Sequence, residues 1–435
     1  MQYYSTNRHS PPVSFRDAAI NGQAPDTGLY FPEYIPQVPE ALIRNIKTYS
    51  REELAFRVMQ PYVGNSMPEP VLKQILAETL NFPIPLIHLG HNCWCLELFH
   101  GPTLAFKDVG ARFMSRCLSY FLRDEKRTVT ILVATSGDTG GAVAHGFYKV
   151  PGVEVCILYP KGMVSPVQEK QLTTLGENIR ALEVNGSFDD CQRMVKQAFA
   201  DPDLQKGLFL SSANSINVAR WLPQQLYYFF ALQQWPAEME PPVVAVPSGN
   251  FGNICAGILA RESGLPIRHF IAACNKNDMV ADYFKTGQWQ PRPAEATLSN
   301  AMDVGNPSNF VRILEITGHQ MPVLKSMLSA DTVTDADTLD AIREMWSEFS
   351  YLADPHGAVA YRALRRYLQN HPGQAGIFLE TAHPVKFPDA IKQAVQQEVK
   401  VPPGLLPLLK QTKKATAIEA QYGKLKEILV GRGER

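Results

Sequence analysis

Apolar residues recur at three- and four-residue spacing in two segments near the start of the chain, 51–63 and 69–81. This spacing puts the apolar side chains on one face of a helix, so it predicts two amphipathic helices. Pro70 stands near the start of the second segment, where its missing N–H costs little. We therefore expect the first ninety or so residues to be mostly helical, with loops between the helices.

From about residue 94 the pattern changes to short β-rich runs, each followed by a helix-period stretch. The runs after the first, at 94–98, are 128–135, 153–159, 179–184, 207–211, 242–246 and 268–273. They are continuously apolar, as strands buried on both faces are. The alternation predicts βαβ units and a mainly parallel sheet with helices on both faces, an α/β fold. The tail from about 332 is predicted to be helical again, with one more strand at 376–380.

Composition excludes several classes of protein. Lys plus Arg and Asp plus Glu both number 42, so the chain lacks the basic excess of a nucleic-acid binder. No apolar run approaches the length of a membrane span, and the N-terminus does not read as a secretory signal. The seven cysteines are odd in number and scattered, which favours reduced thiols in a cytoplasm over a disulfide framework. We expect a cytoplasmic enzyme with no nucleic-acid or membrane partner.

Lys107 follows the first of the β-rich runs, in the segment FHGPTLAFKDVG. Its neighbours are apolar and a Gly-Pro turn precedes them. A desolvated lysine has a lowered pKa and becomes an amine nucleophile for Schiff-base chemistry. The alternative is an ordinary solvated surface charge.

Two loops rich in small residues also follow strands. Ser136, Asp138 and Thr139 belong to SGDTGG, which opens a helix; it is either an anion site or a plain capped turn. The second loop, PSGNFGN at 247–253, is a stronger anion cradle. Neither loop has the spacing of a Walker A or dinucleotide motif, so a phosphate without a nucleotide is the better interpretation.

Three further features have alternative interpretations. Thr381 follows the strand 376–380, and the plain alternative for it is a helix N-cap. His88, His91, Cys93 and Cys95 do not have a usual zinc spacing, so we predict core residues and no metal site. Three lysines near the C-terminus are predicted to form a solvated helix face: Lys410, Lys413 and Lys414.

With these segments assembled, the chain resembles the threonine synthase family, pyridoxal-phosphate enzymes of fold type II. The resemblance covers nearly the whole length and rests on long segments in family order. They are the N-terminal YYSTNRHSPPVSFRDAAINGQAPDTGLYFPE, FHGPTLAFKD, ATSGDTGGA, SSANSINVARWLPQ, VPSGNFGN, DPHGAVAY and TAHPVKFP. It implies a mostly helical region at 1–92, an α/β cofactor-binding core of two lobes at 93–330, and helices with a last strand at 331–435 that complete the large lobe.

The resemblance also implies residue roles. Lys107 would bind the cofactor covalently, and Thr381 would meet its pyridine nitrogen. The loop that holds the substrate α-carboxylate would be the one with Ser136, Asp138 and Thr139. The cofactor phosphate would be held by Gly249, Asn250, Phe251, Gly252 and Asn253.

The chain departs from the family pattern at Asn253 and Gly357, and the family itself, with Asp138, departs from the wider fold type II pattern. Asn253 stands where many relatives have Asp, and an uncharged residue is electrostatically easier beside a dianion. Asp138 stands where fold type II enzymes generally carry Asn, and Gly357 where relatives often have Thr.

The implied reaction converts O-phospho-L-homoserine and water to L-threonine and phosphate. A second phosphate must then be held, and Arg220 and Lys386 are the candidates. Arg220 is otherwise a structural helix residue. The resemblance favours a monomer. Alternatives are another fold type II lyase, such as threonine dehydratase or cysteine synthase, and a binding protein that has lost activity.

Overall fold

A computed structural model describes residues 1–124 and 128–431 of the chain. The N-terminal region combines a small antiparallel sheet with four helices. The sheet has the order β2-β1-β3 and consists of β1 (Gln2–Ser5), β2 (Val13–Ser14) and β3 (Tyr30–Pro32). The helices are α1 (Phe15–Asn21), α2 (Glu40–Arg44), α3 (Arg51–Val63) and α4 (Glu69–Thr79). Both predicted amphipathic helices are confirmed, and the Ser50 hydroxyl caps α3 by accepting from the Glu53 N–H.

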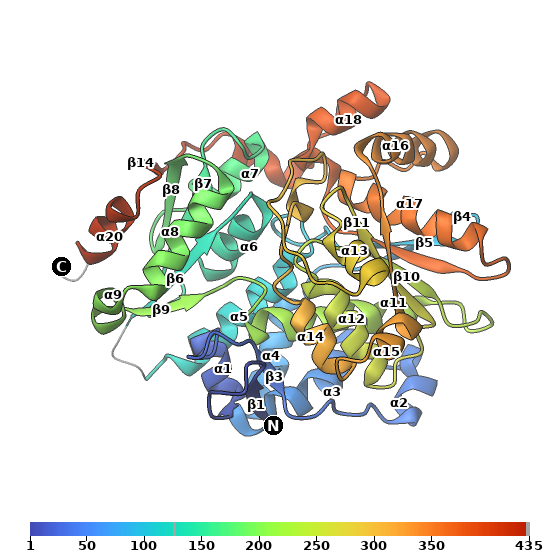
Figure 1. Cartoon of the computed structure of the whole chain (residues 1–435), viewed down its shortest axis with the longest axis horizontal. Helices are drawn as coiled ribbons and strands as arrows, with labels where there is room; N and C mark the ends of the chain where they lie inside the picture. The colour runs from blue at the N-terminus through green and yellow to red at the C-terminus, as the bar shows by residue number, and fades with distance from the viewer. Residues whose placement is uncertain (125–127, 432–435) are drawn as a thin grey trace.

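A six-stranded sheet forms one half of the α/β core and appears on the right of Figure 1. In spatial order its strands are β12 (Leu328–Thr332), β11 (His269–Cys274), β10 (Val243–Pro247), β13 (Gly376–Glu380), β5 (Cys93–Glu97) and β4 (Leu86–Gly90). All neighbours pair in parallel except β4, which runs antiparallel to β5.

A five-stranded parallel sheet forms the other half, on the left of Figure 1. In spatial order its strands are β14 (Ala415–Glu419), β8 (Ile179–Asn185), β7 (Val153–Pro160), β6 (Val129–Ala134) and β9 (Phe209–Ser212). Leu132, Cys156 and Leu182 on neighbouring strands are fully buried. The predicted α/β class with mainly parallel sheets is therefore confirmed.

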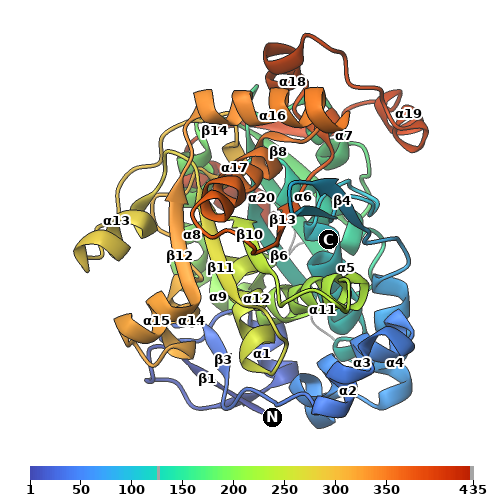
Figure 2. The same ribbon diagram turned by 90° about the vertical axis from the view of Figure 1, so that its right-hand side faces the viewer.

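Helices cover both sheets, as the two views in Figures 1 and 2 show. Those nearest the five-stranded sheet are α6 (Asp138–Phe147), α7 (Pro166–Thr173), α8 (Phe188–Ala200), α9 (Pro202–Gly207) and α20 (Tyr422–Val430). The remaining helices are α5 (Lys107–Phe121), α10 (Val218–Trp221), α11 (Gln225–Gln234), α12 (Gly252–Glu262), α13 (Met279–Thr286), α14 (Phe310–Ile316), α15 (Met321–Met327), α16 (Asp335–Phe349), α17 (Pro355–Gln369), α18 (Pro388–Val395) and α19 (Leu406–Leu409).

The C-terminal region differs from the prediction in two ways. Besides β13 it contributes β14, which pairs with β8 in the five-stranded sheet, so it does not complete the six-stranded half alone. The predicted lysine helix face is wrong in its helix only: Lys410, Lys413 and Lys414 are exposed as predicted, but none lies within a helix, and Lys413 is in the segment before β14. Its ammonium pairs with the carboxylates of Glu169 at 2.7 Å and Glu183 at 2.5 Å. Its partners are far away in sequence, so a local charge pattern does not reveal them.

The core interpretation of the cysteines near residue 93 is confirmed. Cys93 and Cys95 are fully buried in β5. For the two histidines the core prediction is wrong: His88 and His91 are exposed, although the His88 ring packs on Trp94 with centroids 4.3 Å apart. Across residues 1–124 and 128–431, no group of His, Cys, Asp and Glu side chains could hold a metal ion. In the same part of the chain, no helix is both long and apolar enough to cross a bilayer.

Candidate active site

A cavity of about 1400 Å³ lies where loops from both sheets meet. Its walls include loops that follow the carboxyl ends of β6, β10 and β13, where α/β folds place their ligands. The structure brings eleven of the twelve predicted site residues to this wall. They are Lys107, Ser136, Asp138, Thr139, Arg220, Gly249, Asn250, Phe251, Gly252, Asn253 and Thr381. Lys386 is the exception.

Lys107 is placed by two backbone pairings with the segment after β13. The Phe106 N–H donates to the Thr381 carbonyl at 2.9 Å, and the His383 N–H donates to the Leu104 carbonyl at 3.1 Å. These bonds put the first residue of α5 beside the end of β13. Lys107 and Thr381, far apart in sequence, therefore share one corner of the cavity.

The turn before Lys107 is fixed by Asp108. Its carboxylate accepts from the Thr103 hydroxyl at 2.6 Å and from the Thr103 N–H at 2.8 Å. A Cβ at Gly101 would lie 2.4 Å from the same carboxylate, so only glycine leaves room for it. The GPTLAFKD segment is therefore a rigid turn that holds Lys107 in place on the cavity wall.

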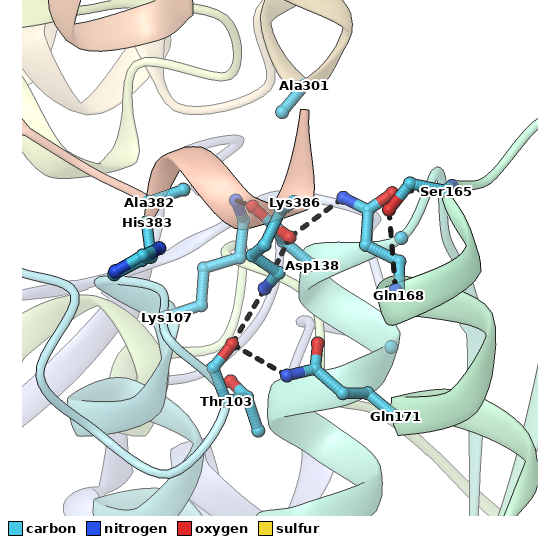
Figure 3. A network of polar contacts seen from close by, with 12 residues as sticks. Thr103, Lys107, Asp138, Ser165, Gln168, Gln171, Ala301, Ala382, His383 and Lys386 are labelled. Atoms are coloured by element: carbon cyan, nitrogen blue, oxygen red, sulfur yellow. Dashed lines mark hydrogen bonds and ion pairs between the residues drawn. The ribbon is translucent and has the colours of Figure 1, made fainter. Parts of the chain in front are cut away.

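Lys107 shares its pocket with an ionised acid and a second lysine (Figure 3). Its ammonium lies 3.9 Å from Asp138 Oδ2, and its side chain is 16% exposed, so the surface-charge alternative is wrong. Burial lowers the pKa of Lys107, and nearby Lys386 and Arg220 lower it further, outweighing the opposing pull of Asp138. The environment favours the neutral, nucleophilic amine.

Asp138 is held by a buried network. Lys386 Nζ lies 2.7 Å from Asp138 Oδ1 and donates to the Thr103 carbonyl at 2.7 Å, and Gln168 Nε2 donates to Asp138 Oδ1 at 2.9 Å (Figure 3). Burial alone would raise the pKa of Asp138, but Lys386 and Lys107 hold it well below its usual range. Asp138 is thus an anion in the cavity wall, which repels a substrate carboxylate and attracts the Lys107 ammonium.

Lys386 does not take the predicted place of a phosphate ligand. Its side chain is 0% exposed, both its recorded contacts are to protein oxygens, and it stands behind Asp138 instead of on the cavity wall. The sequence shows only that a lysine follows TAHP; it does not show that Asp138 from another sheet lies within reach.

The start of α6 is not capped by Ser136 or Asp138. Gly137 stands at the N-cap with φ 136°, a backbone conformation that favours glycine. The Thr135 hydroxyl accepts from the N–H groups of Gly137 and Gly140, both at 2.9 Å. Asp138 and Thr139 are the first two residues of the helix, whose N–H groups have no intrahelical acceptor. These two amides suit the predicted binding of a carboxylate, whereas the Asp138 side chain does not.

The loop between β10 and α12 has the properties of a phosphate site. Phe251 adopts a left-handed conformation, φ 61°, and leaves the N-terminus of α12 without a side-chain cap. The Tyr228 hydroxyl donates to Asn253 Oδ1 at 2.6 Å, which leaves the buried Asn253 Nδ2 without a partner in the described chain. A helix N-terminus with a spare buried donor fits an anion. Asn at position 253 supplies a donor that Asp could not.

Arg220 lies on the cavity wall in the short helix α10. It is 3% exposed, its Nη1 donates to the Ala213 carbonyl, and its Nε has no partner among the described residues. Burial lowers the pKa of Arg220 to about 10, so the guanidinium stays protonated at neutral pH. A buried cation with spare donors is suited to a phosphate or carboxylate.

Thr381 is not a helix N-cap, because the short 3-10 helix after it, Pro384–Lys386, is capped by the His383 side chain. The Thr381 backbone carbonyl accepts a hydrogen bond from the Phe106 N–H, and Thr381 lies on the cavity wall. The side chain is therefore available for a ligand in the same corner as Lys107.

Several residues of this site were missed from the sequence. Gln168 and Gln171 of α7 hold Asp138 and the Thr103 carbonyl, at 2.9 Å and 3.0 Å. The capping-box pattern that starts α7 signals the helix but not the direction in which its glutamines point. A further buried group, behind Thr381, consists of Asp354, His356 and Glu380.

The chain matches models of known protein families over nearly all of its length. Residues 78–379 match the family described as pyridoxal-phosphate dependent enzyme. The cavity and the lysine within it therefore belong to an enzyme that uses pyridoxal phosphate. Residues 2–80 match the family described as threonine synthase N terminus, and residues 357–429 match the threonine synthase C-terminal family. The chain belongs to the threonine synthase family.

Individual relatives are similar over their full length. The threonine synthase of Serratia marcescens is 44% identical, with 99% of each chain covered. The crystal structure of threonine synthase from Escherichia coli superposes with a TM-score of 0.93 at 42% identity and covers 99% of this chain and 100% of that one. The structure of pyridoxal-phosphate-bound threonine synthase from Brucella melitensis superposes with a TM-score of 0.93 at 35% identity, with 100% of each chain covered.

The threonine dehydratase alternative is related to this chain only in fold. Threonine deaminase isoform 2 of Solanum lycopersicum superposes with a TM-score of 0.57 at 14% identity, over 76% of this chain and 94% of that one. The predicted fold type II architecture is confirmed, and threonine dehydratase is a distant relative.

Proposed function

We propose that the enzyme converts O-phospho-L-homoserine and water to L-threonine and phosphate. The observation that carries the proposal is the cavity itself, which joins a desolvated lysine, an uncapped helix N-terminus with a spare donor, and a buried arginine with spare donors. Together they provide a place for one amine and two anionic groups.

The residues present fit the cofactor. The start of α12 and Asn253 Nδ2 would hold its phosphate, Lys107 would bind it covalently, and Thr381 would meet its ring nitrogen. When bound, pyridoxal phosphate supplies an electron sink for negative charge at the substrate's α-carbon.

Lys107 supports this chemistry as the general base. To accept a proton from Cα it must be neutral, and burial beside Lys386 lowers its pKa in that direction. Asp138 lies near enough to attract the ammonium that forms when the amine takes up a proton. One lysine can thus take the proton at Cα and later return a proton at Cγ, after phosphate has left.

Arg220 is the proposed ligand of the substrate phosphate. Its guanidinium is a buried cation on the cavity wall with a single hydrogen bond to the protein, and a hydrogen bond from it to a phosphate would be charge-assisted. Lys386 supports the site through Asp138 instead of contacting substrate. The N–H groups of Asp138 and Thr139 are the proposed donors to the substrate α-carboxylate, with Ser136 beside them on the wall.

The test is product analysis with the purified enzyme, pyridoxal phosphate and O-phospho-L-homoserine. We expect threonine and phosphate in equal amounts, and no 2-oxo acid when threonine is the substrate. Formation of a 2-oxo acid from threonine would support the dehydratase alternative instead, and absence of any turnover would support the binding-protein alternative.

Covalent attachment is tested separately. Borohydride reduction of the loaded enzyme should fix the cofactor to Lys107, as peptide mapping would show. Lys107→Ala should lose both the adduct and the activity, whereas Lys285→Ala, a change at an exposed lysine of α13, should keep both. An adduct on any other lysine of the wild-type enzyme would refute the assignment.

We further propose that the enzyme works as a monomer in the cytoplasm without a nucleic-acid partner. All seven cysteines are buried as free thiols, which suits a reducing compartment, and the net charge is zero. Sedimentation of the loaded enzyme would test the monomer.

A further inference from the structure

Behind Thr381 lies a buried acidic group that the proposed chemistry does not use. Glu380, the last residue of β13, is 0% exposed, as is Asp354, the N-cap of α17. The Asp354 N–H donates to Glu380 Oε1 at 2.5 Å, while Glu380 Oε2 has no partner among the described residues. A buried carboxylate oxygen without a donor is costly, so Glu380 needs a proton there.

The charges around Glu380 also disfavour its ionised form. Glu97 stands opposite it in register on β5, and the Asp354 carboxylate lies beside it. The remaining polar neighbours are Cys95 and Tyr351, whose hydroxyl donates to Glu97 at 2.9 Å. No lysine or arginine in the described chain forms an ion pair with Glu380 or Asp354. Burial is the main cause that raises the pKa of Glu380 well above its usual range, and the negative charge of Asp354 is the next.

Glu380 occupies the space that a side chain at position 357 would need. A Cβ added at Gly357 would lie 1.5 Å from Glu380 Oε2. Gly357 is in the first turn of α17 and has an ordinary helical backbone, so the carboxyl group, and not the backbone, requires glycine. In this chain, glycine at position 357 is therefore what leaves room for the Glu380 carboxyl group.

The acidic group reaches the cavity through His356. Asp354 Oδ1 contacts His356 Nδ1, and His356 Nε2 accepts from the Ala301 N–H at 3.2 Å. The segment around Ala301 and Met302 packs against the phosphate loop, because a Cβ at Gly249 would lie 2.8 Å from Met302 Cα. His356 and Ala301 both line the cavity.

We propose that Glu380 is a positioning residue, held as a neutral acid in the space left by Gly357. It fixes the side chains of Asp354 and His356. Through them it holds residues 300–302 against the loop at 247–253, where the cofactor phosphate would bind. The inference rests on the proposed function for the identity of the ligand at that loop. The Glu380 carboxyl group shares its proton with the Asp354 carboxylate beside it, Asp354 orients the His356 ring, and His356 fixes the Ala301 amide. The chain of contacts ends at Gly249.

The fit between Gly357 and Glu380 is tested by whether the effect of Glu380→Ala on the unfolding temperature changes sign when position 357 is alanine. Gly357→Ala should lower the unfolding temperature and weaken cofactor binding about ten- to a hundredfold, the effect of losing a buried hydrogen bond. Glu380→Ala should also weaken cofactor binding in the wild-type background, yet raise the unfolding temperature when added to Gly357→Ala. Gly423→Ala is the matched control: Gly423 is in the first turn of α20 with open space around it, so alanine should not destabilise there.

The neutral acid is tested by Glu380→Gln. Glutamine can accept from the Asp354 N–H and donate to the Asp354 carboxylate, so this variant should keep the cofactor affinity that Glu380→Ala loses. The infrared difference between wild type and Glu380→Gln at neutral pH should contain a protonated-carboxyl band.

Three results would overturn the proposal: a carboxylate band in place of the acid band, unchanged cofactor affinity in Glu380→Ala, or a double variant no more stable than Gly357→Ala. None of these measurements needs turnover of phosphohomoserine. A failure of the proposed reaction would therefore be seen separately.

Discussion

Arg220 and Arg312 show how two buried arginines can differ in role. Burial lowers the pKa of each to about 10, so both remain cations at neutral pH. Arg312 donates from all three nitrogens to the oxygens of Tyr30, Asn309 and Ile216, and its ring-stacked guanidinium lies 4.3 Å from the Trp221 centroid. Arg220 lies on the cavity wall with one hydrogen bond from its guanidinium, and its buried Nε has no partner among the described residues. Arg312 is structural, whereas Arg220 has donors left for a ligand.

Arg220→Gln should therefore lower kcat/KM for phosphohomoserine about ten- to a hundredfold, since a hydrogen bond to a charged group is worth about 1.5–3 kcal/mol. The bound-cofactor absorbance should be unchanged. Arg312→Gln is the control, expected to lower the unfolding temperature without a selective loss of substrate affinity. An Arg220→Gln enzyme with wild-type kcat/KM would remove this residue from the substrate site.

Thr381 makes a second prediction at this scale. Its hydroxyl is the proposed contact to the cofactor ring, and its backbone is already used to hold Phe106. Thr381→Ser should keep most activity, because the hydroxyl survives. Thr381→Val keeps the shape but loses the hydroxyl, and should reduce kcat about tenfold, the cost of one neutral hydrogen bond. Equal rates for the valine variant and wild type would show that the hydroxyl has no role.

Among the elements, the sequence predicted those whose pattern is local. The apolar run 376–380 coincides with β13, and the helical spacing in 51–63 coincides with α3. It did not predict β12 or β14, whose sequences LSADT and ATAIE mix polar and apolar residues. Both are edge strands, and β14 pairs with β8 more than 200 residues earlier. Such strands are defined by a distant partner, which a local window cannot contain.

The same C-terminal region yields a prediction at the scale of elements. Leu425 of α20 is 0% exposed and packs in a cluster with Met194 of α8. Leu425→Ala should reduce the free energy of unfolding by about 2–5 kcal/mol, as other buried leucines do. Lys424→Ala, one position earlier and 52% exposed, should have little effect. Urea unfolding of both variants checks this, and equal midpoints would mean that α20 is not docked.

For the whole molecule, the dependence of stability on pH follows from the buried acids. The pKa of Glu380 is raised in the folded protein, so above its unfolded value of about 4.3 the native state binds more protons than the unfolded state. Its contribution to stability is therefore lost as the pH rises from there through the folded pKa. Asp138 has a lowered pKa, so its contribution is lost only as the pH falls into the acid range.

Glu380→Gln removes the first of these contributions. Its unfolding temperature should rise relative to wild type as the pH increases from about 5 to 8, because in wild type the unfolded state releases the Glu380 proton that the native state keeps, and glutamine has no such proton. Thermal scans of both proteins across this range measure the difference. A difference that stays constant with pH would mean that Glu380 does not hold an extra proton.

The loops that form the cavity could largely be predicted from the sequence, whereas the side-chain contacts behind the cavity wall could not. Each cavity loop follows a strand, and parallel strands bring their carboxyl ends together, so the loops with Ser136, Gly249 and Thr381 could be assembled from sequence. The partners of Lys386 and Glu380 lie on other elements, at Asp138 and Gly357. No property of the local sequence encodes such contacts between side chains from distant segments.

The seven buried thiols make the enzyme a clean background for chemical labelling. Burial raises the pKa of Cys93 to about 11 and of Cys191 to about 12, and all seven side chains are shielded from reagents. A cysteine placed at exposed Gln197 in α8, and another at exposed Lys285 in α13, would be the two reactive sites. A dye on each then reports the distance between the two halves of the cavity wall as substrate enters, without removing any native cysteine.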